Sequence, residues 1–433
     1  MNNLLDRNPT LAAVFVFIII AATRILFINL YAVDIPWADQ WDGEIERIYF
    51  KYLEGTLSFS DFWAQANEHR IILTKLLNLL SFNLSGYQFN QINALYLQSI
   101  IFSITPSILA YFVNRDRFHP FKTLLLILIF FPVIDWENAY WSYQSQVYFS
   151  ILFGIIGAYF ASKQNRSFII ISIITVLAGL ANGAAFYIPA LATCACVIAW
   201  KRNRPILEII YYLSLSVLSY KLFTAATPWH DQYKADSILE LGKSLLSYTA
   251  WPQKIGWVLW PLLGLQALIT AKKIYVSDSG ITNTERYGLF LSIWFLLFLA
   301  SSTYARAGFP NVPIRYYAYY LVGFSAFLLF EYKFKPLTLR IVLVLICTVY
   351  AAEAIKDFIK WQKYSEMKTL YRSNFIETLR MVKDNPNIQS TDIRKNIEKL
   401  PLPYAGYPNY EVPSRIIQNP KSIQIFYYLL NDN

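Results

Sequence analysis

The sequence predicts an all-α fold, a polytopic bundle of transmembrane helices with smaller segments on its outer face. Apolar residues make up 56% of the 433 residues, and aromatic residues make up 17%. Charged residues make up only 15%, against about 25% in an ordinary soluble domain. The apolar residues also cluster in runs close to the roughly 20 residues that a helix needs to cross a bilayer. The same composition excludes disordered, collagen-like, coiled-coil and disulfide-rich secreted proteins.

Eleven apolar runs are candidates for these helices. The first has no basic start and no small-residue cleavage site, so we expect a retained span rather than a signal peptide. Several runs are shorter than a straight spanning helix, and their ends must include flanking Trp and Tyr or be buried among other helices. The runs lie at about 11–33, 91–113, 120–134, 147–162, 168–181, 185–200, 206–224, 256–271, 287–303, 316–331 and 340–354.

Lys and Arg predict the orientation, because they favour the cytoplasmic side of a membrane. With a cytoplasmic N-terminus, every connection on that side is short and basic, whereas the outer connections 135–146 and 182–184 contain no Lys or Arg. This pattern predicts a multi-pass protein of the inner (cytoplasmic) membrane, with larger periplasmic or extracellular segments at 34–90, 225–255 and 355–433. Much of the net charge of +10 then faces membrane lipids, and no nucleic-acid partner is expected.

Two of these outer segments have a predicted internal organisation. Within 34–90, residues 44–54 and 69–82 have apolar positions at helical spacing, which is typical of helices that lie in the membrane interface. We expect this loop to belong to a transmembrane module formed by residues 1–354. The C-terminal tail that follows is predicted to form a helix over about 355–383 and then an extended cap rich in Tyr and Pro.

The first outer loop begins with carboxylates close to the end of the first apolar run. Four of them fall within eleven residues, at Asp34, Asp39, Asp42 and Glu44. Carboxylates beside an apolar boundary have raised proton affinity, which suits a general base acting on a hydroxyl group. The plainer interpretation is a solvated loop next to an aromatic belt formed by Trp37 and Trp41. We favour a functional role because no Lys or Arg within the motif relieves the acidic crowding.

The same loop contains Glu68, His69 and Arg70 in succession, just before the second predicted interfacial helix. Such a cluster can bind a carboxylate or phosphate, or orient a base, and we count its three members as candidate substrate-binding residues. The alternative is that Asn67 and Glu68 cap the N-terminus of the helix. The sequence favours neither interpretation over the other.

The second outer loop, 135–146, combines carboxylates, amides and aromatic rings without a positive charge. Carboxylates and amides bond to sugar hydroxyls, and aromatic rings stack on the C–H faces of sugars. An aromatic belt explains the Trp and Tyr residues of this loop but not its polar residues. We therefore predict a polar-ligand site that includes Asp135, Glu137 and Gln144.

A later outer loop places two arginines, Arg306 and Arg315, at the membrane edge in a stretch without acidic residues. Arginine makes bidentate contacts with phosphate groups. Snorkelling toward lipid head groups is the alternative, but topology alone disfavours arginines on the outer side. The loop is therefore predicted to bind a phosphate, with the adjacent Tyr316 as part of the site.

Together these features resemble the GT-C superfamily of integral-membrane glycosyltransferases. The shared features are an inside N-terminus, about eleven spans, an acidic motif directly after the first span, an interfacial first loop, a late loop with two arginines and a tyrosine, and an outer C-terminal segment. The resemblance implies transfer of a sugar from a polyprenyl-phosphate donor to a hydroxyl of a glycan, lipid or protein acceptor of the cell envelope. The chemistry of such a transfer, which needs a base for the acceptor hydroxyl and a clamp for the phosphate, points the same way: we expect Asp42 or Asp39 to take the acceptor proton while Arg306 and Arg315 hold the departing phosphate.

The acidic motif departs from the superfamily pattern. It reads Asp39-Gln-Trp-Asp42 instead of the Asp-Glu or Glu-x-Asp form of many members, so the identity of the base stays open. A single displacement at the sugar predicts inversion of the anomeric centre. Two carboxylates can hold a divalent metal, but a monophosphate clamped by arginines needs none. The sequence therefore requires no cofactor and leaves a divalent metal open.

Two other classes of function are compatible with the same outer loops. One is a lipid-linked glycan flippase or transporter, which predicts polar residues at the membrane midplane and Gly- or Pro-broken spans in matching halves. The other is an O-antigen polymerase or ligase that uses a diphosphate-linked donor. Because the polar groups gather at one outer edge and no half-repeat is seen, we favour catalysis over transport.

Overall fold

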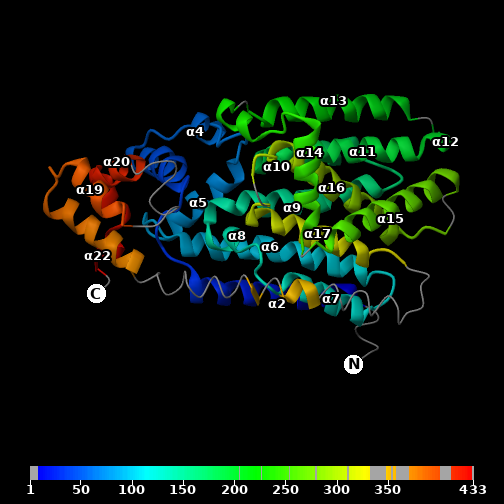
Figure 1. Cartoon of the computed structure of the whole chain (residues 1–433), viewed down its shortest axis with the longest axis horizontal. Helices are drawn as coiled ribbons and strands as arrows, with labels where there is room; N and C mark the ends of the chain where they lie inside the picture. The colour runs from blue at the N-terminus through cyan, green and yellow to red at the C-terminus, as the bar shows by residue number, and fades with distance from the viewer. Residues whose placement is uncertain are drawn as a thin grey trace.

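The structure is a computed structural model, and it describes residues 8–203, 205–225, 227–252, 254–277, 280–309, 312–331, 348–352, 355–356, 370–399 and 411–431. Over these ranges the chain is helical, and the only β-type pairing consists of isolated bridges among residues 66, 69 and 224. The predicted all-α class is confirmed. The long helices run roughly side by side along the long axis of the molecule (Figure 1).

Each of the first ten predicted runs coincides with a helix. The eleventh, 340–354, lies mostly outside the described residues, although its part at 348–352 is helical. Local signals explain several starts: Asn8 caps the first helix ahead of Pro9, and Thr282 forms a capping box with Glu285. The helices are α2 (Pro9–Tyr31), α6 (Gln91–Val113), α7 (Pro120–Phe130), α9 (Ser145–Ser162), α10 (Phe168–Ala181), α11 (Tyr187–Ile198), α13 (Ile206–Phe223), α15 (Gly256–Val276), α16 (Asn283–Ala305) and α17 (Tyr317–Leu328).

Five helical segments in the described part of the chain are long and apolar enough to cross a membrane, namely α2, α6, Ser142–Ser162, α13 and α16. Their outward faces are apolar: Ile18 and Leu26 on α2 and Val217 on α13 are all exposed. In water such faces are unfavourable, whereas lipid chains cover them without cost. The structure thus supports a multi-pass membrane protein.

The loop 34–90, which the sequence predicts to be the first outer loop, folds into short helices: a π-helix η1 (Trp41–Phe50), α3 (Lys51–Glu54), α4 (Phe59–Trp63) and α5 (Ile72–Leu84). Both predicted amphipathic segments are therefore helical. Helix α5 turns polar residues such as Lys75 and Asn78 inward and leaves Leu76, Leu80 and Leu84 exposed. This inverted polarity suits a helix that meets lipid with its outer face while its inner face borders a polar site.

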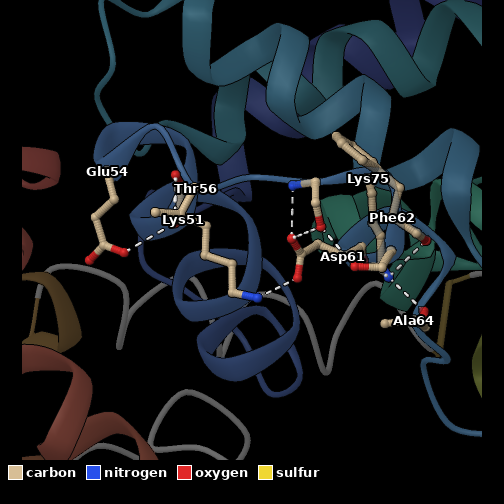
Figure 2. Close-up of polar contacts among 9 residues, drawn as sticks. Lys51, Glu54, Thr56, Asp61, Phe62, Ala64 and Lys75 are labelled. Carbon is tan, nitrogen blue, oxygen red and sulfur yellow. Dashed lines mark hydrogen bonds and ion pairs between the residues drawn. The ribbon is translucent and has the colours of Figure 1, made fainter.

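Lys75 ties the loop together (Figure 2). Its ammonium group donates to the backbone carbonyls of Asp61, Phe62 and Ala64 at 2.9, 3.1 and 2.7 Å. Lys51 forms an ion pair with the Asp61 carboxylate, which also accepts from the Ser58 backbone at 2.9 Å. Burial lowers the pKa of Lys75 to about 8, so the lysine remains charged at neutral pH and holds the stretch that leads into residues 67–70.

The C-terminal tail packs onto this loop. Residues 370–384 are helical and are followed by α19 (Ser390–Ile397), α20 (Glu411–Gln418), α21 (Pro420–Ile425) and α22 (Tyr427–Asn431), which gather at one end of the molecule (Figure 1). The tail helix predicted over about 355–383 is helical where the structure describes it, at 355–356 and 370–383. The expected extended cap is wrong for α19 to α22, because their apolar residues have a surface to bury against. The ring of Trp41 packs against Phe375 and Phe426.

Candidate functional site

Four segments that are distant in sequence meet at one end of the bundle. The Ala225 N–H donates to the carbonyl of Glu68 at 3.0 Å, and the Gly308 N–H donates to the carbonyl of Tyr233 at 3.0 Å. These bonds join the first outer loop, the 3-10 helix η4 (Pro228–Tyr233) and the loop after α16. The fourth segment, α8 (Trp136–Tyr140), contacts the 3-10 helix η5 (Ile314–Tyr316).

Glu68 is the hub of this cluster. Its carboxylate forms an ion pair with Arg306, and Nδ1 of His230 lies 2.6 Å from its second oxygen. Nε2 of His69 lies 3.7 Å from the same carboxylate. Arg306 is buried, and the negative charge of Glu68 offsets the free-energy cost of burying its positive charge. Glu68 and His69 lie close together, but Glu68 holds an arginine and does not cap α5.

His69 is held as a neutral ring. The Gly183 N–H donates to its Nδ1 at 3.2 Å, so the ring proton lies on Nε2, on the side of Glu68. Burial lowers the pKa of His69 to about 4, with further lowering from His230 and Arg315. Gly183 permits this approach, because a Cβ at that position would lie 2.6 Å from Nδ1.

The second arginine, Arg315, is held by α8. Its Nη1 and its backbone N–H each lie 3.2 Å from the Glu137 carboxylate, and the Asn138 amide donates to the Arg315 carbonyl at 2.8 Å. Its guanidinium lies 5.8 Å from the ring centre of Tyr316. The arginine loop is free of acidic residues in sequence, yet in space each arginine has a glutamate from another loop.

Asp39 is the carboxylate of the acidic motif whose charge interacts with Arg315. It is half-buried and accepts a hydrogen bond from the Asn67 amide at 3.3 Å. Burial raises its pKa and nearby Asp42 raises it further, while Arg315 lowers it. The residue before it, Ala38, has a φ of 46°, a left-handed conformation that disfavours alanine and often marks a functional site.

Asp42 has a different environment. Its side chain is 43% exposed and lies 3.8 Å from Nη2 of Arg47. The structure thus distinguishes the two aspartates of the motif: Asp39 is partly desolvated beside a guanidinium, and Asp42 lies at the solvent-facing rim.

Glu44 is part of the scaffold below the site. It is 3% exposed and accepts hydrogen bonds from the Tyr49 hydroxyl and from the amides of Gln40 and Asn78, the last two at 3.0 and 3.1 Å. Burial raises its pKa to about 7 against these three bonds, which lower it. The expectation that Glu44 binds substrate is not supported, because all its contacts are internal.

Three other predicted substrate-binding residues also have internal roles. Asp135 is fully buried and pairs with Arg24 of α2 at 2.5 Å, with the Tyr148 hydroxyl bridging them. Arg70 donates to the carbonyls of Trp63 and Leu222 at 2.6 and 3.0 Å. Gln144 is buried where the 3-10 helix η2 (Ser142–Gln144) meets α9. A charged residue within an apolar span needs a partner of opposite charge. The presence of Arg24 in the first apolar run was therefore the sequence signal that Asp135 has a structural role.

His230 is the member of the site that the sequence did not single out. It lies in η4, and its signals were weak: it is one of three histidines, and it falls in a predicted outer segment. Over the described residues, no three His, Cys, Asp or Glu side chains are arranged to hold a metal ion. A metal held by Asp39 and Asp42 would thus lack a third such ligand in that part of the chain.

The chain matches no family model, no curated protein and no solved structure. Its function is therefore inferred from the cluster formed by Asp39, Glu68, Glu137 and the two arginines.

Proposed function

We propose that the protein is a membrane glycosyltransferase. It moves a sugar from a polyprenyl-phosphate donor to a hydroxyl of a cell-envelope glycan, lipid or protein on the outer face of the inner membrane. One observation carries the proposal: a half-buried carboxylate with a raised pKa, Asp39, shares one end of an apolar bundle with Arg306 and Arg315. A base and a phosphate clamp are the two parts that such a transfer needs.

The two arginines bind the donor phosphate. A guanidinium has five N–H donors, and Glu137 accepts from one of those of Arg315, while Glu68 accepts from one of those of Arg306. The remaining donors are available to phosphate oxygens or to neighbouring groups. Each glutamate thus acts as a positioning residue, and Tyr316 borders the clamp from η5.

Asp39 takes the proton from the acceptor hydroxyl. The acceptor oxygen attacks the anomeric carbon from the face opposite the phosphate and forms the new C–O bond. The bond from that carbon to the phosphate oxygen breaks, and its electron pair leaves with the phosphate, so the anomeric centre inverts. Negative charge grows on the phosphate as it departs, which is where the two arginines contribute most. Asp42, at the rim, raises the proton affinity of Asp39.

The membrane topology belongs to the same proposal. Eleven spans with a cytoplasmic N-terminus place the arginine cluster on the periplasmic or extracellular face. Five helical segments of the described residues have the length and apolarity for crossing, and the shorter helices pack among them. The exposed apolar surface of the bundle provides a path along which the prenyl chain of the donor reaches the site.

The test is a sugar-transfer assay in membranes with a panel of polyprenyl-phosphate hexoses and pentoses. We expect Asp39→Asn to lower the rate by about 100-fold or more. Arg306→Lys and Arg315→Lys keep the positive charge but lose the planar guanidinium that contacts a phosphate through two N–H groups, and we expect each to lower the transfer rate about tenfold or more. Glu46→Gln is the matched control, because this carboxylate of η1 pairs with Arg415 of the tail.

Normal transfer by the Asp39→Asn and both arginine variants, at wild-type expression, would refute the mechanism. Movement of a lipid-linked glycan without transfer would instead establish a flippase or transporter. Consumption of a diphosphate-linked donor alone would establish a polymerase or ligase.

A further inference from the structure

A basic cavity lies at the end of the bundle opposite the arginine cluster. It has a volume of about 220 Å³ and is lined by the ends of α9 and α11, the connection 163–166, part of α15 and the first turns of α16. Helix α9 begins at Ser145, next to η2, and ends at Ser162 in the cavity wall. Its 18 residues separate the two places by about 27 Å.

The cavity wall carries three cations and no carboxylate. The cations are Lys163, Arg166 and Arg286. The side chain of Arg166 is 7% exposed, and Arg286 is 8% exposed. Buried cations are costly unless anions or hydrogen-bond acceptors surround them, so a wall of this composition favours an anion.

Contacts within the described part of the protein satisfy the hydrogen-bonding groups of Arg166 only in part. One Arg166 nitrogen lies 3.2 Å from the Glu208 carboxylate, and another donates to the Lys163 carbonyl at 3.1 Å. Its buried Nε has no hydrogen-bond partner among the described residues. Lys163 places its ammonium group 4.2 Å from the ring centre of Tyr159, a contact that leaves its N–H donors open to another acceptor.

We infer that this cavity binds the phosphate group of an anionic phospholipid. Its volume of about 220 Å³ is below the roughly 300–1,000 Å³ of sites for drug-sized ligands, so it admits a phosphate and a small head group but not a nucleotide. Exposed apolar residues adjoin the wall in sequence: Val197 precedes Ile198 of the wall, and Leu207 precedes Glu208, the partner of Arg166. Acyl chains attached to the bound phosphate lie along this surface.

The inference is independent of the proposed sugar transfer. It uses residues at the other end of the bundle, and a lipid bound there anchors α9, α11 and α16 to one leaflet. Such a site strengthens the attachment of these helices to anionic membranes.

Lipid retention by the purified full-length chain tests the inference. The protein is transferred from detergent into bilayer discs of phosphatidylcholine, alone or mixed with phosphatidylglycerol, and the lipid retained after release is counted by native mass spectrometry. We expect the wild type to retain phosphatidylglycerol over phosphatidylcholine. Lys163→Gln lowers this retention about tenfold, the effect of losing one charged hydrogen bond, whereas Lys163→Arg keeps it.

Lys201→Gln is the matched control, because Lys201 is an exposed cation on α12 (Trp200–Asn203) at the same end of the bundle but outside the cavity wall. Equal loss in Lys163→Gln and Lys201→Gln would overturn the inference, as would equal retention of the two lipids by the wild type. Inorganic phosphate is the second probe. If it displaces the lipid only at large excess, the lipid is the ligand, and if it binds as well as the lipid, the lipid assignment is overturned.

Discussion

Glu44 makes the stability of the protein depend on pH. Its carboxylate is buried below η1, and burial raises its pKa from 4.5 to about 7. At pH values between these two pKa values, the folded protein binds a proton that the unfolded chain releases. The contribution of Glu44 to the free energy of unfolding is therefore fully present below about pH 4.5, declines as the pH rises, and is lost above about pH 7. A shift of this size corresponds to about 3 kcal/mol.

Glu44→Gln removes this dependence. Glutamine is neutral at every pH, and its carbonyl oxygen accepts the bonds that the Gln40 and Asn78 amides make to one oxygen of Glu44. We expect the variant to gain stability relative to the wild type as the pH rises from 5 to 8, approaching about 3 kcal/mol. In thermal unfolding of the detergent-solubilised protein, this appears as a gain of a few degrees in Tm at pH 8.

The control is Glu46→Gln, which removes a carboxylate from the exposed side of the same helix. Its Tm should follow the wild type across the pH range, because an exposed ion pair contributes little. Parallel pH profiles for wild type and Glu44→Gln would refute the reasoning, since they would mean that Glu44 is ionised in the fold without cost.

Three further predictions concern packing and pairing. Gly183→Ala places a methyl group against Nδ1 of His69, and we expect the free energy of unfolding to fall by about 1–3 kcal/mol. Thermal unfolding measures this as a lower Tm, and sugar transfer should be slower. Asp135→Leu leaves the Arg24 charge buried and costs about 3–5 kcal/mol, whereas adding Arg24→Met recovers most of the loss; thermal unfolding of both variants checks this. Trp41→Ala opens the interface between loop and tail and costs about 3–5 kcal/mol, and limited proteolysis should then cut the tail faster.

The helices could be predicted from the sequence because their signal is local. A run of apolar residues between basic connections determines a helix without reference to the rest of the chain, and all ten described runs bear this out. The helices at the end of the tail, α19 to α22, were missed for the opposite reason. Residues 411–431 include Pro413 and Pro420, yet they fold as helices because the first outer loop offers Trp41 and Phe89 as partners.

The pairing of charges could not be predicted, because each pair joins segments far apart in sequence. Arg306 is 238 residues from Glu68, and Arg315 is 178 residues from Glu137. Residue type indicated phosphate chemistry for the arginines, but only the fold reveals that two glutamates hold them. The same holds for Asp135, whose partner Arg24 lies 111 residues away.

These glutamates also bear on how a phosphate leaves the proposed site. A guanidinium pair without acidic neighbours binds a phosphate tightly and releases it slowly, whereas carboxylates that share the same guanidinium groups compete with it. In the proposed mechanism, Glu68 and Glu137 therefore lower the affinity for donor and product alike, and they hold the guanidinium groups of Arg306 and Arg315 in place between turnovers. Arg315 lowers the pKa of Asp39, and in the same proposed mechanism the negative charge of a bound donor phosphate offsets that effect. The base is then weakest when the donor is absent and strongest when the acceptor must be deprotonated.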